Sequence, residues 1–64
     1  MKADEWLKAD ETRLAQVTTT KAGRLQIELL AVDQRNGSGK SFARAEGETI
    51  GDAAMNLERA WPVR

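Results

Sequence analysis

The run Gly-Ser-Gly-Lys-Ser at 37–41 has the residue types of a loop that holds phosphate. A phosphate-binding loop of this kind carries a further glycine five positions before the glycine that precedes the lysine, and a helix follows it. Here the position five before Gly39 is Gln34, and the residues after the run predict a strand. The turn preferences of Asn36-Gly37 and their neighbours favour a flexible hairpin loop instead.

Nucleophilic catalysis and zinc binding usually need side chains that this chain lacks. There is no His and no Cys among 64 residues, which excludes Ser–His and Cys–His systems, ordinary zinc sites and disulfides. A carboxylate site for Mg²⁺ would need acidic residues that converge. The acidic residues are dispersed along the sequence and most are expected to be solvated. We therefore expect no catalytic residue, no cofactor and no metal. The acidic residues are Asp4, Glu5, Asp10, Glu11, Glu28, Asp33, Glu46, Glu48, Asp52 and Glu58.

The charge and hydropathy of the chain limit which partners it can bind and where in the cell we expect it. Ten basic and ten acidic residues cancel, whereas a nucleic-acid binder typically has a basic excess. The absence of Cys fits a reducing cytoplasm. No apolar run reaches the roughly 18 residues of a transmembrane helix, and the charged N-terminus lacks the apolar centre of a signal peptide. We expect a cytoplasmic protein that does not enter membranes.

The pattern of apolar residues predicts one α+β domain over residues 1–64. Its centre, at 12–46, is a three-stranded antiparallel meander with strands near 13–20, 24–33 and 40–46, because alternation, threonines and turn residues recur there. Residues 1–11 form a short helix or an extended segment. The C-terminal helix spans 49–61, and a short tail, 62–64, follows it. The expected order is therefore α-β-β-β-α, with the N-terminal helix left open.

The last third of the sequence predicts an amphipathic helix that packs on one face of the sheet. Thr49 is a typical N-cap, and Asp52 three residues later resembles a capping box with Asp in place of Glu or Gln. Pro62 cannot continue the helix. Burial of Ile50, Leu57 and Trp61 should stabilise the domain by about 1.5–3 kcal/mol each. The apolar face consists of Ile50, Ala53, Ala54, Leu57, Ala60 and Trp61.

Leu30 and Val32 break the alternation of the central strand. Leu25, Ile27 and Leu29 predict an inward face, so Leu30 and Val32 should lie on the outer one. Either a bulge shifts the register there, or something covers that face. The cover would be the N-terminal segment with Trp6 and Leu7, or a second copy of the chain. Trp6 itself lies either at the edge of the core or exposed, as an anchor of the kind that is enriched in interface hot spots.

The basic residues form two small groups in an up-down-up meander. Arg13, Arg35 and Lys40 should lie at one end of the sheet, with Lys21 and Arg24 at the other. Two small groups bind a phosphate backbone less well than one continuous stripe.

The sequence Gly47-Glu48-Thr49-Ile50-Gly51-Asp52-Ala53-Ala54-Met55-Asn56-Leu57-Glu58-Arg59-Ala60 resembles the strand–helix segment of HicB-type antitoxins. That family runs from a β-meander into Gly-x-Thr-x-x-Glu-Ala, followed by an Asn and a late Ala. Here Gly47, Thr49, Ala53, Asn56 and Ala60 match, and Asp replaces the Glu. The acidic, Pro- and Gly-containing stretch that the family has before this Gly is absent, and residues 1–64 contain no counterpart of the DNA-binding segment that follows in the family. The resemblance implies a β-β-β-α topology and an antitoxin-like role.

The expected order of elements is also similar to that of double-stranded-RNA-binding domains. In those domains a Lys-Lys pair at the entry of the last helix contacts phosphate, and Ile50-Gly51 stands there in this sequence. This resemblance therefore concerns topology.

These observations predict a small non-catalytic protein-interaction module that regulates or inhibits a protein partner, as antitoxins and phage-encoded inhibitors do. Trp6, Leu30 and Val32 are the expected partner-binding residues, and the chain could also form a homodimer. The alternative function is nucleic-acid binding. Its candidate residues are Arg13, Arg35, Lys40 and Arg44.

Overall fold

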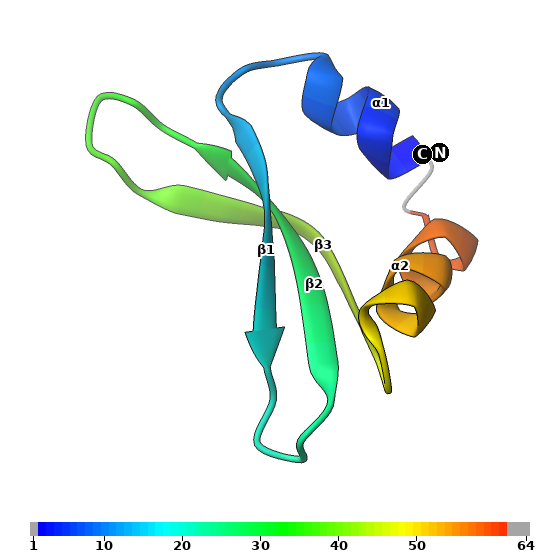
Figure 1. Cartoon of the computed structure of the whole chain (residues 1–64). Helices are drawn as coiled ribbons and strands as arrows, with labels where there is room; N and C mark the ends of the chain where they lie inside the picture. The colour runs from blue at the N-terminus through cyan, green and yellow to red at the C-terminus, as the bar shows by residue number, and fades with distance from the viewer. Residues whose placement is uncertain (1, 62–64) are drawn as a thin grey trace.

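The computed structural model describes residues 2–61 and shows three antiparallel strands in one sheet, with two helices on the same side of it (Figure 1). This α+β arrangement, α-β-β-β-α, confirms the predicted fold class, and the N-terminal segment, which the sequence left open, contains a helix. The strands begin and end within one residue of their predicted bounds. The second helix ends two residues before its predicted bound, and the predicted helix stop at Pro62 lies outside the described residues. The elements are α1 (Lys2–Lys8), β1 (Arg13–Thr19), β2 (Leu25–Val32), β3 (Gly39–Gly47) and α2 (Ile50–Arg59).

The strand register decides which side chains face the helices. In the sheet order β1-β2-β3, Leu29 of β2 lies opposite Ala15 of β1 and Ala43 of β3. Directly opposite residues of an antiparallel pair share a face, so alternate positions of each strand point to the side of the sheet that carries the helices. The inward direction predicted for Ile27 and Leu29 is confirmed. The buried hydrophobic core of the described residues consists of Ile27, Leu29, Ala53 and Leu57.

The junction between β3 and α2 brings two backbone segments into close contact at Gly47. A Cβ atom on this residue would collide with the backbone nitrogen of Ala53 and would lie 2.7 Å from the carbonyl carbon of Asp52. Only glycine allows this approach without displacing the backbone. The approach seats Ala53 in the core with no exposed surface.

Two polar side chains complete this junction. The Thr49 hydroxyl accepts a hydrogen bond from the backbone N–H of Asp52 at 3.1 Å, which satisfies one of the free donors of the first helical turn. Asn56 Nδ2 donates to the backbone oxygen of Glu46 at 2.8 Å and ties the middle of α2 to the end of β3. Capping and close packing therefore account for residues that also carry the resemblance to HicB-type antitoxins.

The expected contribution of Ile50 to the core is wrong. Its side chain is 56% exposed, because Ile50 opens α2 and the close approach to the sheet comes one turn later, at Ala53. Trp61 is half-buried and packs against the core cluster.

The register between β2 and β3 shifts at the place where the alternation of β2 fails. Leu29 pairs with Ala43, but Leu30 pairs with Ser41, so Phe42 is an extra residue on β3. A bulge of this kind locally re-aims side chains. Here Phe42 joins Trp6 on the helix side of the sheet. Of the two alternatives left open by the sequence, the structure has the bulge, and the extra residue belongs to the partner strand.

The N-terminal helix is fixed at both ends. Glu58 of α2 accepts hydrogen bonds from the backbone N–H groups of Lys2 and Ala3, at 2.9 and 2.8 Å. Trp6 and Leu7 pack against the core cluster. Because these contacts hold α1 on the same side as α2 (Figure 1), residues 1–11 do not cover the outer face of the sheet, and this one of the two alternative covers is wrong.

Candidate binding site

An open hollow of about 240 Å³ lies at one end of the sheet, where α1, the start of β1 and the start of β3 meet. Its lining combines aromatic, basic and small residues. It is lined by Trp6, Arg13, Ala31, Lys40, Ser41 and Phe42.

Three aromatic rings form a continuous cluster beside the hollow. Trp6 and Phe42 stack with their ring centroids 4.6 Å apart and an angle of 17° between their planes. Phe42 also meets Trp61 at 5.8 Å and 58°. Both arrangements fall in the range in which aromatic pairs attract one another beyond their burial. Phe42 is nevertheless 42% exposed, so one part of its ring is fixed within the chain while another part faces solvent.

Arg13 is bound to Trp6 in two ways. Its guanidinium carbon lies 4.5 Å from the centre of the indole ring, which is a cation–π contact. Its Nη1 also donates to the backbone oxygen of Trp6 at 2.9 Å. Because Arg13 and Phe42 both contact the indole, much of the ring surface of Trp6 is occupied within the chain.

A turn before β1 fixes the position of Arg13. The backbone N–H and the hydroxyl of Thr12 donate to Oδ1 of Asp10 at 2.9 and 2.8 Å. These two bonds hold the pKa of the Asp10 carboxyl below its ordinary value, and the bond from the backbone N–H contributes more than the bond from the hydroxyl. The N–H of Arg13 donates to the Asp10 backbone oxygen at 3.1 Å. The start of β1 is therefore set by hydrogen bonds that the ionised carboxylate strengthens.

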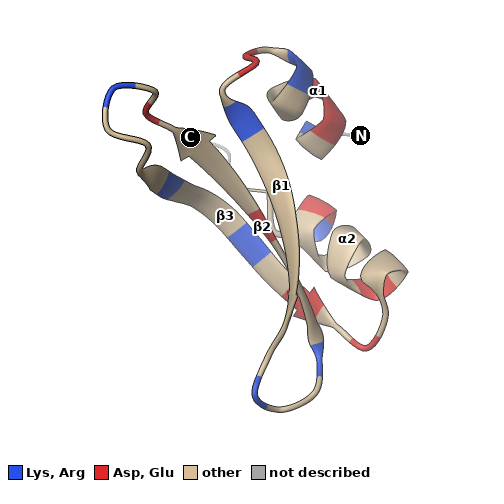
Figure 2. Cartoon of the chain, turned by 60° about the vertical axis from the view of Figure 1, so that its left-hand side comes forward, with Lys and Arg blue, Asp and Glu red and all other residues tan. Residues whose placement is uncertain are grey.

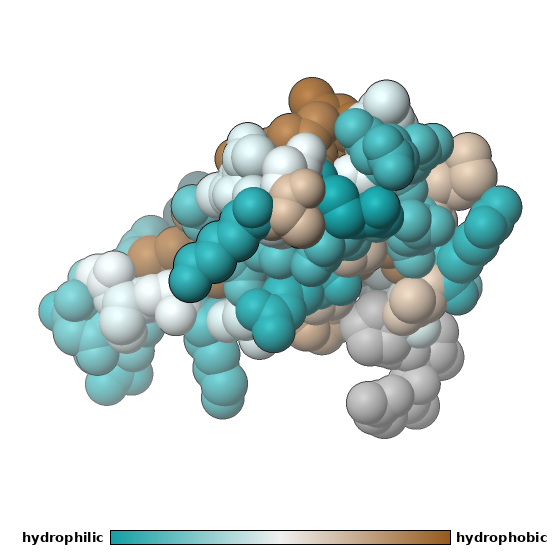
Figure 3. Space-filling view, turned by 90° about the horizontal axis from the view of Figure 1, so that it is seen from below, coloured by the Kyte–Doolittle hydropathy of each residue, from teal (hydrophilic) through white to brown (hydrophobic). Residues whose placement is uncertain are grey.

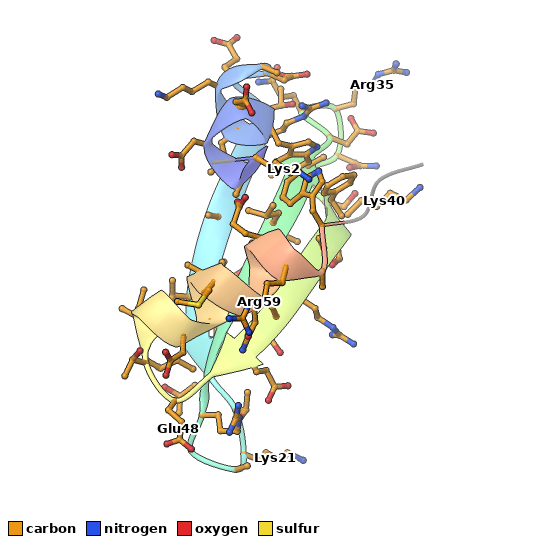
Figure 4. All side chains as sticks on the ribbon, turned by 90° about the vertical axis from the view of Figure 1, so that its right-hand side faces the viewer. Lys2, Lys21, Arg35, Lys40, Glu48 and Arg59 are labelled. Carbon is orange, nitrogen blue, oxygen red and sulfur yellow. The ribbon has the colours of Figure 1, made fainter. Side chains whose placement is uncertain are left out.

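The structure brings some of the predicted basic residues together. Arg13 and Lys40 line the same hollow, and Arg35 lies in the neighbouring hairpin, at the same end as Lys40 (Figure 4). Arg44 does not join them, because it pairs with Glu28 and therefore lies on the opposite face of the sheet. Figure 2 shows that further basic residues lie in the β1–β2 hairpin at the far end of the sheet.

The predicted partner-binding residues lie on two different faces. Trp6 is on the helix side, whereas Leu30 and Val32 alternate with inward-facing residues of β2 and point to the outer face. A Cβ on Gly39 would contact Leu30, which places these two residues side by side there. Leu14 of β1 lies opposite Leu30. Figure 3 shows exposed hydrophobic side chains interspersed with hydrophilic ones over the underside of the molecule.

Phe42 is the site residue that the sequence-based prediction missed. Its position in the third strand would place it on the outer face if the alternation were regular, and the bulge reverses this. The usable signal was composition, since Phe42 is the single phenylalanine in a chain with two tryptophans and no tyrosine.

Comparisons of the chain with protein-family models, curated proteins and solved structures gave no match. The resemblances to HicB-type antitoxins and to double-stranded-RNA-binding domains therefore stay predictions. Within residues 2–61, no helix is long and apolar enough to cross a membrane. The same residues contain no group of three or more acidic side chains arranged to hold a metal ion.

Proposed function

We propose that this chain is a non-catalytic protein-interaction module that binds a protein partner through the hollow that Trp6, Phe42 and their neighbours line. The observation that carries the proposal is the exposure of Phe42, which is 42% accessible although the stack on Trp6 fixes its ring. Exposed aromatic side chains that are rigid before binding lose little conformational entropy in a complex. Hot spots of protein interfaces are enriched in Trp and Arg.

The size and charge of the hollow favour one side chain as its occupant. Its volume of about 240 Å³ is smaller than the roughly 300–1,000 Å³ of pockets for drug-sized ligands and cofactors. Arg13 and Lys40 place positive charge beside the aromatic wall. A partner segment with an apolar side chain next to a carboxylate would match both features, since charge complementarity steers association and selects partners.

This binding would regulate or inhibit the partner by occupying its surface, in the manner of an antitoxin or a phage-encoded inhibitor. Ten acidic and ten basic residues give the chain no long-range attraction to nucleic acid. We place this activity in the cytoplasm. The absence of His and Cys supports a role without nucleophilic catalysis.

Nucleic-acid binding is the second candidate, and the convergence of Arg13, Lys40 and Phe42 at one hollow favours it. Single-stranded nucleic acid binds to surfaces that combine aromatic platforms with basic side chains. The indole of Trp6, however, already contacts Arg13 and Phe42. Little of it is left for a base to stack on, and we therefore rank this candidate second.

Affinity capture with the tagged chain from its source cells, with and without nuclease, tests the proposal. The key variant is Phe42→Ser, and the matched control is Met55→Ser, which alters a hydrophobic residue of α2 that is 51% exposed. We expect the tagged chain to capture a protein whether or not nuclease is added. The Met55→Ser variant should still capture this protein, and the Phe42→Ser variant should not. Binding of the purified partner in a calorimeter should then weaken at least about tenfold with Phe42→Ser, the equivalent of 1.4 kcal/mol.

Two outcomes would contradict the proposal. Capture that nuclease abolishes would favour nucleic acid as the ligand. Capture that Phe42→Ser and Met55→Ser leave equally intact would move the binding surface away from the hollow, to the outer face with Leu30 and Val32.

A further inference from the structure

The strand β1 forms one edge of the sheet and carries no charge along most of its length. From Leu14 to Thr20 the sequence has no charged residue and no proline, and all of β1 after Arg13 is exposed. An edge strand with these properties is a template for pairing with another strand, and proteins normally protect such edges with charges, prolines, bulges or a cover.

The opposite edge of the same sheet has that protection. Lys40, Arg44 and Glu46 distribute charge along β3, and the bulge at Phe42 interrupts its pairing geometry. The helix α2 packs mainly against β3 and less against β2. The two edges therefore differ in kind, and β1 is the one open to a further strand.

The backbone groups of β1 that are free to pair follow from the bonds it makes to β2. The Thr12 oxygen accepts from the N–H of Val32, and the N–H of Thr20 donates to the Arg24 oxygen. Backbone groups alternate in direction along an antiparallel strand, so the even-numbered residues of β1 face β2. The odd-numbered residues after Arg13 face away from the sheet. These are Ala15, Val17 and Thr19.

We propose that β1 pairs antiparallel with β1 of a second copy, so that three strands from each chain make one continuous six-stranded sheet. Gln16 is the middle residue of β1 (Arg13–Thr19). Pairing over the full strand places Gln16 opposite Gln16 of the second copy. In the same register Ala15 faces Val17, and the outward-facing backbone groups of both chains meet. Main-chain hydrogen bonds then supply the affinity, as in other cases of strand addition.

The charges at the ends of β1 favour a second copy as the added strand. In the full-length register Arg13 lies opposite Thr19 of the other chain, so no like charges oppose each other. Glu11 and Lys21 lie in the turns just beyond the two ends of β1, so antiparallel pairing brings an acidic turn of one chain toward a basic turn of the other at each end of the interface. The edge is therefore complementary to itself, which a twofold symmetric interface requires.

The exposure of Val17 gives a second reason for this interface. Val17 lies opposite Ile27 on the helix side of the sheet, but it is 47% exposed because α2 covers the other two strands. A second β1 would bring an alanine and a valine against it. Such burial matters for a 64-residue chain, since domains of about 60 residues bury only about 60% of their surface on folding.

Sedimentation velocity on the full chain over a series of concentrations tests the proposal. The variant Val17→Lys places a charge on the edge, and Met55→Lys is the control on α2. We expect a dimer for the wild type and for Met55→Lys, and a monomer for Val17→Lys. The variant Ala15→Pro provides an independent check, because it removes an outward-facing N–H and no bond to β2. It should also be monomeric and should keep the circular dichroism of the folded chain.

Three results would overturn the proposal. The first is a wild-type chain that stays monomeric up to about 1 mM, the range of the weakest specific complexes. The second is a dimer that Val17→Lys and Ala15→Pro both leave intact. The third is a dimer that dissociates with Leu30→Lys but not with Val17→Lys, since this would assign the interface to the outer face of the sheet. None of these results depends on the partner proposed for the hollow.

Discussion

Trp6 of α1 and Phe42 of β3 stack with their ring centroids 4.6 Å apart, and this contact links the N-terminal helix to the bulge in the sheet. Without the extra residue at position 42, regular alternation would turn the phenylalanine to the outer face. The bulge therefore does two things: it ends the regular register between β2 and β3, and it supplies the surface on which Trp6 is held.

Replacing Phe42 with Ala should loosen α1. The loss of the stack removes about 0.5–1.5 kcal/mol beyond the burial term. Because Phe42 contacts both Trp6 and Trp61, the tryptophan emission should shift to longer wavelength as water reaches the two indoles. Chemical denaturation followed by tryptophan fluorescence measures both effects. Leu14→Ala, which also shortens an exposed hydrophobic side chain of the sheet, is the control and should leave the emission unchanged. An unchanged spectrum in Phe42→Ala would mean that the stack is not populated in solution.

Replacing Gly47 with Ala should destabilise the junction between β3 and α2. The added methyl group would collide with the backbone of Ala53 and Asp52, and overpacking of this kind costs about 1–3 kcal/mol. Thermal unfolding followed by circular dichroism gives the loss. Gly51→Ala is a suitable control, because a Cβ there meets nothing closer than Thr49 Oγ1 at 3.8 Å. An Ala at Gly51 should stabilise the helix by up to about 1 kcal/mol.

Leu57→Ala should cost about 2–5 kcal/mol, the range for removing a large side chain from a packed core. Leu57 is 3% exposed and belongs to the buried cluster. In a domain this small the loss should leave much of the chain unfolded at about 37 °C, because total stabilities of small domains are about 5 kcal/mol or less. Urea titration compares the variant with Met55→Ala on the same helix, which should change stability by less than about 0.5 kcal/mol. Equal midpoints would show that the buried face of α2 has been assigned wrongly.

The attachment of α1 to α2 should weaken in acid. The backbone N–H groups of Ala3 and Lys2 donate to Glu58 and hold the pKa of its carboxyl below the ordinary value. A carboxyl whose pKa is lower in the folded state contributes stability above its unfolded pKa, and that contribution is lost as pH falls through the folded pKa. Thermal unfolding between about pH 7 and about pH 3 should show this loss. Glu58→Gln should reduce the pH dependence. Part of the pH dependence should remain in this variant, since the pKa of the Asp10 carboxyl is lowered as well.

The strands and α2 could be predicted from the sequence because each has a local signal. Alternation marks β2, and Thr49 with the apolar spacing that follows marks α2. No local signal in the sequence predicts where α1 packs in the fold. Its position depends on Glu58 and Phe42, which are distant in sequence. The hollow depends in turn on the bulge, a tertiary feature that the broken alternation at Leu30 indicated without showing which strand carries the extra residue.

Salt dependence separates the two candidate ligands. Each phosphate that a basic side chain neutralises contributes about −0.9 to the slope of log affinity against log salt on duplex DNA. Arg13, Lys40 and Arg35 lie at one end of the sheet, but the guanidinium of Arg13 is already bound to Trp6. At most about three phosphates could be neutralised, which is too few for tight binding at physiological salt.

We therefore expect no measurable affinity for generic duplex DNA or RNA near about 150 mM salt. For a protein partner, salt should act mainly on the association rate, because the energy lies in desolvated anchors. Trp6→Ala should then weaken binding more than Lys40→Ala, since it removes the surface that holds Phe42 in place. Fluorescence anisotropy with labelled duplexes and calorimetry with the captured protein measure the two cases. Sub-micromolar duplex binding at that salt, lost when Arg13, Arg35 and Lys40 are all changed to Ala, would reverse the ranking of the two functions.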